Sequence, residues 1–556
     1  MSDIHRPLLR FRLLFAVLAV AVVGTTFAQP VDDNPPVGWW HDATFYEIFV
    51  RSFADSTKGP LANDGIGDLQ GLIDHLDYLN DGRGADSHSL GINAVWLMPI
   101  QPSPSYHGYD VIDYFAVNPQ YGDVALMKKF VAAAHRHGIR VIIDLVLNHA
   151  SSEHPLFRQA LASTDDQKDP RALFRFAPTP EQLYGPWGTR VWHPAGKEFY
   201  YGLFSPEMPD WNFRNPVVTA HHRRCAEFWL KDVGVDGFRL DAVRYFFEDG
   251  DTPVDAPETL RWLHDFTAYC HQIKPGSFVV GEVAADTDTI SRYIHGSLDS
   301  AFEFDLARAV IESVRLKTPG VLELVTNRLA RRYGADHPWS SFLSNHDQDR
   351  VLSQLDGNPA QMRFAAKLLF TLPGVPFVYY GEELGMTGTK PDPEIRTPMP
   401  WSATEPNAGF TGATVRPWHA VTGQIRTTNV ADEEQDPHSL LALYQHLIRM
   451  NRDSAALRHG TSVPVSVRDR RVYAAMRQTG NEAVLVLANF STTARACPEL
   501  NVAQSEVRAG WAREELVTGA PIAPPALTAA GGFGAWRPFA TLAPESVYVI
   551  RWMGTR

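Results

Sequence analysis

The sequence predicts an α/β protein built on a (β/α)₈ barrel, the TIM barrel, with an excursion subdomain after strand 3 and a C-terminal antiparallel β-domain. Three observations predict this architecture. Eight short, nearly continuous apolar runs alternate with amphipathic stretches, which is typical of a parallel sheet covered by helices. One connection, 149–213, is far longer than the others and rich in Pro, Gly and aromatic residues. Beyond residue 457 the pattern changes to short alternating runs, as in antiparallel strands.

The eight candidate barrel strands share a high content of β-branched and aromatic residues, which favour extended structure. The stretches between them, such as 124–137 and 220–231, have the apolar spacing of amphipathic helices. The predicted strands are 44–50, 94–98, 140–146, 237–240, 277–280, 301–304, 340–343 and 376–380.

The long connection 149–213 is expected to fold as a subdomain, because structureless loops of this length are uncommon in compact domains. The barrel then comprises 29–148 and 214–456. The remaining residues, 457–556, form the C-terminal domain, with candidate strands at 471–476, 483–488 and 546–550.

Residues 1–28 have the three parts of a secretory signal peptide: Arg6, Arg10 and Arg12, an apolar run over 13–23, and small residues ending at Ala28. A membrane anchor is the alternative, but a spanning helix needs about 20 apolar residues. We therefore expect cleavage after Ala28, a secreted or periplasmic protein, and no membrane association after the signal is removed.

The composition excludes several classes of protein. Of the 556 residues, 44% are apolar and 21% are charged, which is the composition of a globular rather than a disordered chain. The net charge of −12 argues against nucleic acid as a partner, because phosphate binding requires a basic surface. Three cysteines are too few for a disulfide framework, and we interpret them as thiols.

Polar side chains follow the predicted strands at the points where barrel enzymes carry their active sites. Arg239 and Asp241 are two residues apart and therefore point to the same side of their strand. Three carboxylates from strands four, five and seven should meet at one mouth of the barrel. The polar residues at the strand ends are His107, Tyr109 and Asp110; Asp144, Asn148 and His149; Arg239 and Asp241; Glu282; and His346 and Asp347.

Glycoside hydrolysis needs at least two carboxyl groups facing the scissile bond, one to attack or activate water and one to supply a proton. Arg239 would keep Asp241 ionised, as a nucleophile requires. Glu282 follows an apolar strand, where weaker solvation would help it to hold a proton as a general acid. Each residue alone would more readily be a helix cap or an ion-pair partner. Their joint placement at successive strand ends favours catalysis.

At these positions the sequence resembles the α-amylase family of glycoside hydrolases over nearly all of the predicted mature chain. The family's short motifs occur here in order. The resemblance is greatest to the bacterial α-amylases intermediate between oligo-1,6-glucosidases and neopullulanases. The matching segments are Asp144–His149, Met208–Asn212, Gly237–Asp241, Gly281–Val283 and Phe342–Asp347, and the intermediate group is indicated by Asp64–Asp68, Gly381–Glu383 and Ile395–Trp401.

The resemblance implies a role for each matching residue. Asp241 would be the nucleophile, Glu282 the acid/base, and Asp347 the third carboxylate, which holds sugar hydroxyls. The other residues would orient the nucleophile or bind the sugar at the cleavage point; they are Arg239, His149, His346, Tyr109 and His107. Two positions depart from the family pattern, because Arg244 and Tyr245 replace a common Lys-His pair. Arg244 would then bind a sugar on the leaving-group side in place of the lysine.

The resemblance also implies calcium at the first strand–helix connection, with Asp55, Asp64, Asp68 and the Ile66 carbonyl as ligands. Alternating oxygen donors on a Gly-containing loop suit this cation. Without a metal the same residues would form an ordinary acidic turn, and the loop is longer than in the family. A second calcium would lie between Asn148 and Asp210.

The leading interpretation is a secreted, retaining, endo-acting α-amylase that acts on α-1,4-glucans such as starch and maltooligosaccharides and works as a monomer. The alternatives are an exo-acting α-glucosidase or oligo-1,6-glucosidase, and a transglycosylase such as trehalose synthase. A carbohydrate-binding relative that has lost catalysis is disfavoured because all three carboxylates are present. The family further links Ala242, directly after the nucleophile, with α-1,4 rather than α-1,6 cleavage.

Overall fold

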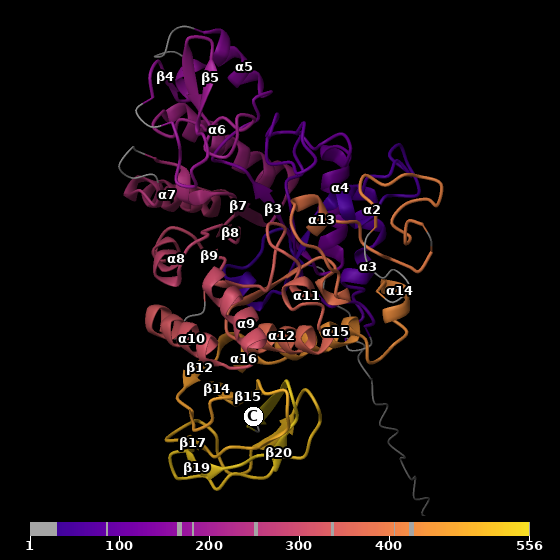
Figure 1. Ribbon diagram of the computed structural model, residues 1–556, viewed down its shortest axis with the longest axis vertical. Coiled ribbons are helices and arrows are strands. Elements are labelled where there is room, and N and C mark those ends of the chain that lie inside the picture. The colour runs from indigo at the N-terminus through magenta and orange to yellow at the C-terminus, as the bar shows by residue number, and fades with distance from the viewer. Residues whose placement is uncertain are drawn as a thin grey trace, which may run out of the picture.

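The computed structural model describes residues 31–84, 87–163, 170–180, 183–248, 254–334, 338–404, 406–421 and 428–554. The predicted signal peptide, residues 1–28, lies outside the described residues. Within the described ranges no helix combines the length and the hydropathy needed to cross a bilayer. In Figure 1 the barrel lies in the middle, the excursion above it, and the C-terminal strands below it in yellow.

The eight predicted barrel strands all form, and they pair in the order β10-β11-β1-β2-β3-β7-β8-β9. Every neighbouring pair is parallel. A parallel bridge between Phe302 and Ser340 joins the two outer strands, so the sheet is a nearly closed barrel as the sequence predicts. The strands are β1 (Phe45–Ile48), β2 (Ala94–Leu97), β3 (Arg140–Leu145), β7 (Gly237–Leu240), β8 (Phe278–Gly281), β9 (Ser300–Ala301), β10 (Ser340–Ser341) and β11 (Val375–Tyr379).

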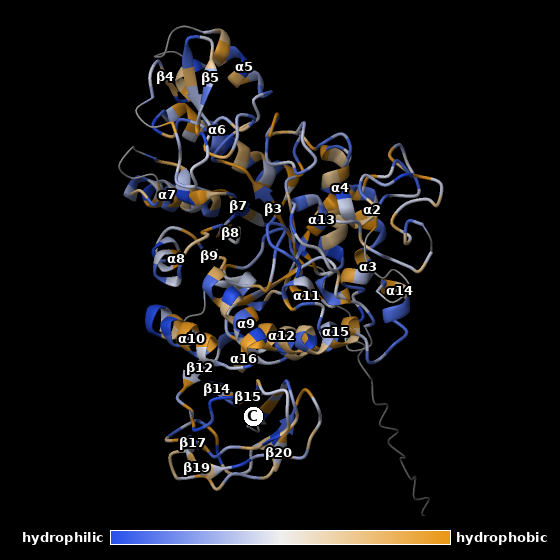
Figure 2. Ribbon diagram, in the orientation of Figure 1, coloured by the Kyte–Doolittle hydropathy of each residue, from blue (hydrophilic) through white to orange (hydrophobic). Residues whose placement is uncertain are grey.

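Amphipathic helices surround these strands, and Figure 2 shows apolar and polar segments alternating along them. Several of the longer helices begin at capping residues, such as Asp123 before α4 and Asn215 before α6. The longer helices are α4 (Val124–Arg136), α6 (Pro216–Glu227), α7 (Pro257–Ile273), α8 (Thr287–Ile294), α9 (Phe304–Leu316), α10 (Gly320–Tyr333), α12 (Pro359–Thr371) and α15 (Leu440–Arg452). The shorter ones are α1 (Val50–Phe53), α2 (Leu69–Asp74), α3 (Leu76–Leu79), α11 (Val351–Gln354), α13 (Asp392–Ile395), α14 (Val430–Glu433) and α16 (Ala455–His459).

The barrel interior is layered from apolar to charged. Phe45 of β1 and Phe377 of β11 stack with ring centroids 4.3 Å apart near the amino ends of the strands. Two residues further along β1, on the same side of the strand, lies Glu47, which is buried. The carboxyl ends of the strands therefore present charged groups above an aromatic layer.

The excursion contains a three-stranded antiparallel sheet in the order β4-β6-β5. Its strands are β4 (Phe176–Ala177), β5 (Trp192–Ala195) and β6 (Glu198–Tyr201). It also contains α5 (Pro155–Ala162), which the sequence pattern did not predict. This helix is too short for a clear helical period, although His154 caps it and Pro155 begins it.

The C-terminal region is antiparallel, as the sequence predicts. A five-stranded sheet has the order β12-β14-β15-β21-β18, beside sheets of three and two strands. Strand β15 is buried along its whole length. The side chain of Phe490, just beyond it, packs on Phe364 of α12 with ring centroids 4.8 Å apart. The strands are β12 (Thr461–Val463), β13 (Ser466–Val467), β14 (Val472–Thr479), β15 (Glu482–Asn489), β16 (Arg495–Ala496), β17 (Leu500–Val502), β18 (Ala512–Glu515), β19 (Phe533–Trp536), β20 (Thr541–Leu542) and β21 (Ser546–Met553).

A buried ion network joins four barrel elements at the amino end of β7. The fully buried Asp236 carboxylate contacts His135 Nε2 at 2.7 Å, and accepts hydrogen bonds from Arg140 Nη1 and Lys274 Nζ at 3.1 Å each. These residues come from α4, β3 and the end of α7. Burial alone would raise the pKa of Asp236, but these partners hold it below its ordinary value.

We expect Asp236→Asn to destabilise the fold by about 3–5 kcal/mol, because it leaves buried cations without their counter-charge. Urea unfolding of the variant measures the loss. The matched control is Asp77→Asn, which removes an exposed carboxylate paired with His137 at 3.1 Å and should cost about 1 kcal/mol or less. Equal losses in the two variants would contradict the assignment. In the wild type, this stabilisation should disappear as the pH falls through the lowered pKa of Asp236.

Candidate active site

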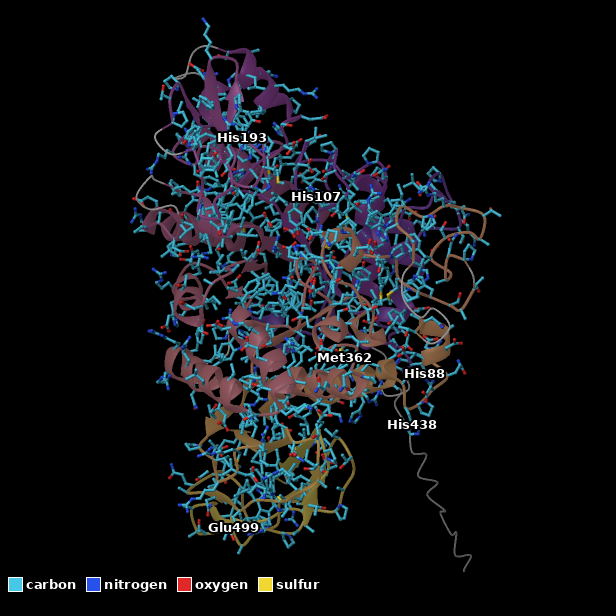
Figure 3. The ribbon with its side chains drawn as sticks, viewed as in Figure 1. His88, His107, His193, Met362, His438 and Glu499 are labelled. Carbon is cyan, nitrogen blue, oxygen red and sulfur yellow. The ribbon has the colours of Figure 1, made fainter. Side chains whose placement is uncertain are left out.

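Seven of the sequence-predicted site residues line one cavity of about 340 Å³ at the carboxyl end of the barrel. Figure 3 labels His107 at this level, below the excursion that carries His193. Residues from the barrel, from the excursion and from the segment after β11 contribute to the lining. The predicted site residues among them are His107, Tyr109, His149, Asp241, Arg244, Glu282 and Asp347.

Arg239 of β7 is the centre of the site. Its buried guanidinium donates from Nη1 to Asp241 Oδ1 at 2.6 Å and from Nη2 to Glu282 Oε2 at 2.7 Å. Nη1 also donates to both carboxylate oxygens of Asp144, at 3.0 Å each. One cation therefore holds three carboxylates, and it brings the two predicted catalytic groups to the same edge of the cavity.

Glu282 is in an environment that favours a bound proton. Burial raises the pKa of its carboxyl group, and the nearby charges of Asp241 and Asp347 raise it further, against the opposing effect of Arg239. The Ala242 backbone N–H donates to Glu282 Oε2 at 3.1 Å and fixes the position of the carboxyl group. This is the protonation behaviour that a general acid needs.

Asp347 is in the opposite environment. Burial opposes its ionisation, but His346 and Arg396 hold the pKa of its carboxyl well below the ordinary range. Arg396 Nη2 donates to Asp347 Oδ1 at 2.8 Å, and His346 Nε2 lies 3.3 Å from Oδ2. Burial lowers the pKa of His346, but Asp347 and Glu47 raise it to about 9, so the imidazole is a cation at neutral pH.

Two further predicted residues face the space between these charges. The Tyr109 ring stacks on His346 with centroids 5.5 Å apart, and its hydroxyl lies 2.6 Å from His346 Nε2. His149 is buried, and neither of its ring nitrogens makes a hydrogen bond within the described part of the chain. A buried polar group without a partner is costly. His149 is therefore suited to bind a polar ligand group in the cavity.

Arg244 lies in the cavity wall, but its strongest contacts are internal. Its Nε and Nη2 donate to the two carboxylate oxygens of Asp255 at 2.8 and 2.6 Å. Its Nη1 donates to the Ala284 carbonyl at 2.6 Å. This arrangement fastens the loop after β7 to the loop that follows Glu282, and the sequence alone did not predict it.

Further residues line the cavity that no sequence pattern predicted, namely Trp187, Phe204, Ala284, Asp392 and Arg396. Arg396 lies within the segment 395–401, which resembles the intermediate group of the family. A signal for its role exists, because it is a cation close after the last barrel strand. Glu47 was missed as well, although a lone acid within the apolar first strand is such a signal.

The predicted calcium ligands Asp55, Asp64 and Asp68 share one loop. Asp55 accepts from Asn63 N at 3.0 Å and from Gly65 N at 2.8 Å, while Asp68 accepts from Gly71 N at 2.8 Å. Burial raises the pKa of Asp55 and of Asp64, and repulsion between these carboxylates adds to the shift. Hard oxygen donors on one loop suit Ca²⁺, but among the described residues the only group of three or more His, Cys, Asp or Glu side chains with ligand atoms within 4.8 Å of one another is His221, His222 and Cys225, so the three carboxylates are not gathered as a complete site.

The residues predicted for a second calcium, Asn148 and Asp210, are hydrogen-bonded to each other, with Asn148 Nδ2 donating to Asp210 Oδ2 at 3.1 Å. Burial and the nearby Glu248 raise the pKa of Asp210. Arg175 lies 3.4 Å from the Glu248 carboxylate and already supplies a positive charge to this group. The donor set suits calcium less well here than at the first loop.

The chain is similar to several known proteins. Residues 47–460 match the family described as "Alpha amylase, catalytic domain". "Alpha-amylase 3" of Dictyoglomus thermophilum is 36% identical over 463 residues, covering 82% of this chain and 85% of that protein. An "Oligo-1,6-glucosidase" of Parageobacillus thermoglucosidasius is 29% identical, covering 82% and 90%. The crystal structure of an α-amylase from H. orenii superposes with a TM-score of 0.77 at 34% identity, covering 92% and 99%.

The family match covers most of the barrel, and the 36% identical relative extends over most of the chain. The nearly closed barrel and the C-terminal antiparallel sheets are also shared with a solved α-amylase. The protein therefore belongs to the α-amylase family of glycoside hydrolases.

Proposed function

We propose that the protein is a secreted, retaining, endo-acting α-amylase that cleaves α-1,4-glucosidic bonds in starch and maltooligosaccharides by double displacement. The contact of one buried guanidinium with both Asp241 and Glu282 carries the proposal. Retaining glycosidases need two carboxyl groups about 5–5.5 Å apart, one ionised and one protonated. A shared cation holds both groups close together, and burial raises the pKa of Glu282, as the proton donor requires.

In the first step, Glu282 donates its proton to the glycosidic oxygen as the bond to the anomeric carbon breaks. Asp241 attacks that carbon from the other face and forms a covalent glycosyl ester. In the second step, Glu282, now ionised, removes a proton from water. The water oxygen attacks the anomeric carbon, and the Asp241 carboxylate leaves with Arg239 stabilising its charge.

The sugar at the cleavage point would be held by the groups around this pair. The Tyr109 ring would lie against its apolar face, and His149 would bond a hydroxyl. His346 and Asp347, fixed by Arg396, would hold two further hydroxyls. The negative charge of Asp347 interacts more strongly with the sugar as positive charge develops there, so this contact favours the transition state over bound substrate.

Two features support an endo-acting enzyme with α-1,4 specificity. Ala242 follows the nucleophile, as in relatives that cleave α-1,4 bonds. Tyr106, beside the cavity residue His107, stacks on Trp418 with centroids 5.5 Å apart, and the Arg396 guanidinium lies 5.9 Å from the Tyr106 ring centroid. Aromatic surface on the Asp347 side suits further glucosyl units on the non-reducing side of the cleaved bond. An exo-enzyme does not accommodate units on that side.

Glu282→Gln should lower kcat on maltoheptaose by about 10²–10⁴-fold, because the leaving oxygen loses its proton donor. The step that forms the glycosyl ester should be spared with α-maltosyl fluoride, since fluoride leaves without protonation. The alkaline limb of the kcat/KM profile should also disappear, because its group has been removed. Glu312→Gln, an exposed position on α9, is the control. Near-wild-type turnover of maltoheptaose would remove Glu282 from the acid/base role.

A maltoheptaose derivative blocked at its non-reducing end tests the mode of attack. We expect the protein to cut this substrate internally and to act poorly on isomaltose and trehalose. Product chromatography reads out both results. Release of glucose from free maltotriose, with the blocked substrate left intact, would instead identify the exo-acting α-glucosidase. Conversion of maltose to trehalose would identify a transglycosylase.

We also propose that Asp55, Asp64, Asp68 and the Ile66 carbonyl hold a structural calcium ion, which would stabilise the native state by mass action. At a free concentration of 100 Kd this amounts to about 2.7 kcal/mol. Chelator treatment should therefore lower the melting temperature, and added Ca²⁺ should restore it. Asp64→Asn should reduce this response, whereas Asp77→Asn should keep it. If neither chelator nor Ca²⁺ changes the melting temperature, these residues form an acidic turn without a bound metal.

A further inference from the structure

A buried group of two histidines and one cysteine lies on helix α6, outside the lining of the catalytic cavity. It consists of His221, His222 and Cys225. His222 and Cys225 are 0% exposed, and His221 is 8% exposed. One ligand atom from each side chain lies within 4.8 Å of the other two. The mechanism described above does not use any of them.

The spacing along α6 brings these side chains together. Cys225 follows His221 by four residues and His222 by three, and both spacings place side chains on one face of a helix. Its Sγ lies 3.7 Å from His221 Nε2. Sulfur and nitrogen ligands of one tetrahedral zinc ion, at about 2.3 and 2.0–2.1 Å from the metal, lie about 3.6 Å apart. The His221 and Cys225 ligand atoms therefore have the separation that a shared zinc ion requires.

Within the described residues, neither ring nitrogen of His222 makes a hydrogen bond. Burial holds the pKa of this imidazole well below its ordinary value, against a smaller opposing effect of the Leu147 carbonyl, so the ring is neutral. A neutral imidazole can give one nitrogen to a metal and direct its other N–H toward a backbone carbonyl, which is the usual arrangement in metal sites. His222 has both requirements, a free nitrogen and a nearby carbonyl.

The surroundings of the group are largely aromatic. The Trp211 ring centroid lies 5.3 Å from that of His221 and 5.8 Å from that of His222, and the Phe213 centroid lies 5.4 Å from that of His222. Polar groups without partners are costly in such surroundings, and a bound ion would satisfy three of them at once. Trp211 and Phe213 belong to the end of the excursion, so the group lies where the excursion returns to the barrel.

From this placement we propose that His221, His222 and Cys225 form a binding site for a zinc ion at the base of the excursion. Thiolate sulfur and imidazole nitrogen are ligands that zinc takes in proteins, whereas calcium takes oxygen. Three protein ligands leave the fourth position of the ion to water, which would enter beside His221, the least buried of the three.

Zinc binding requires that Cys225 lose its thiol proton to solvent, so that the thiolate sulfur can donate an electron pair to the metal. Burial raises the pKa of this thiol, and the proton is therefore present until the metal displaces it. Binding should release one proton for each zinc ion, and the affinity should fall as the pH falls.

Titration of the purified protein with Co²⁺ tests the site, with excess Ca²⁺ present to fill sites made of oxygen ligands. One equivalent of Co²⁺ should produce a thiolate-to-cobalt charge-transfer band, and Zn²⁺ should remove it. Cys225→Ser should lose the band and weaken Zn²⁺ binding by more than about 100-fold, because residues that only support a ligand already contribute 10–100-fold. Cys270→Ser, at an equally buried thiol on α7, is the matched control and should keep both properties.

X-ray absorption at the zinc edge of the wild-type protein needs no variant and should show one sulfur ligand together with nitrogen ligands. The absence of the cobalt band in the wild type would overturn the inference. A band that survives in Cys225→Ser, or a zinc ion surrounded only by nitrogen and oxygen, would place the metal elsewhere and would also overturn it. These measurements do not depend on glycosidase turnover, so their outcome is independent of the proposed function.

Discussion

The site depends on the burial of one positive charge inside the barrel. A guanidinium removed from water must be neutralised by hydrogen-bonded anions, and Arg239 has three carboxylates as partners, from Asp144, Asp241 and Glu282. Three anions exceed the charge of one cation, so protonation becomes favourable within the group. Burial raises the pKa of Asp144 to about 7, and that of Glu282 is raised as well. Burial, helped by the neighbouring carboxylates, thus raises the pKa of Glu282 against the opposing charge of Arg239.

The parts of the molecule that follow a simple rule were predictable from sequence. Parallel strands buried on both sides have near-continuous apolar runs, and all eight were recognised. Residues at the ends of such strands must converge, so Asp241, Glu282 and Asp347 could be placed together before their contacts were known. Helix α5 was missed because eight residues hold little more than two turns, and the period is not distinct over that length.

Other features depend on contacts between loops that are distant in sequence, and no local pattern records these. The bond from Arg244 Nη1 to the Ala284 carbonyl is one example, since nothing in the chain indicates that the loops after β7 and β8 meet. The position of Trp187 above the cavity is another, because a Gly-Pro-Trp-Gly turn says nothing about what lies beneath it. The cation state of His346 also required the structure, since Glu47 lies 299 residues away.

The Asp236 network and the active site lie at opposite ends of the barrel strands. Strands β3 and β7 carry this network at their amino ends, and at their carboxyl ends they carry Asp144 and Arg239. The anchoring contacts and the reactive groups therefore occupy opposite ends of the same two strands. Loops at the mouth can be lengthened, exchanged or grafted from a relative without disturbing the network that joins the barrel helices. New specificities are thus accessible to laboratory evolution at low cost in folding.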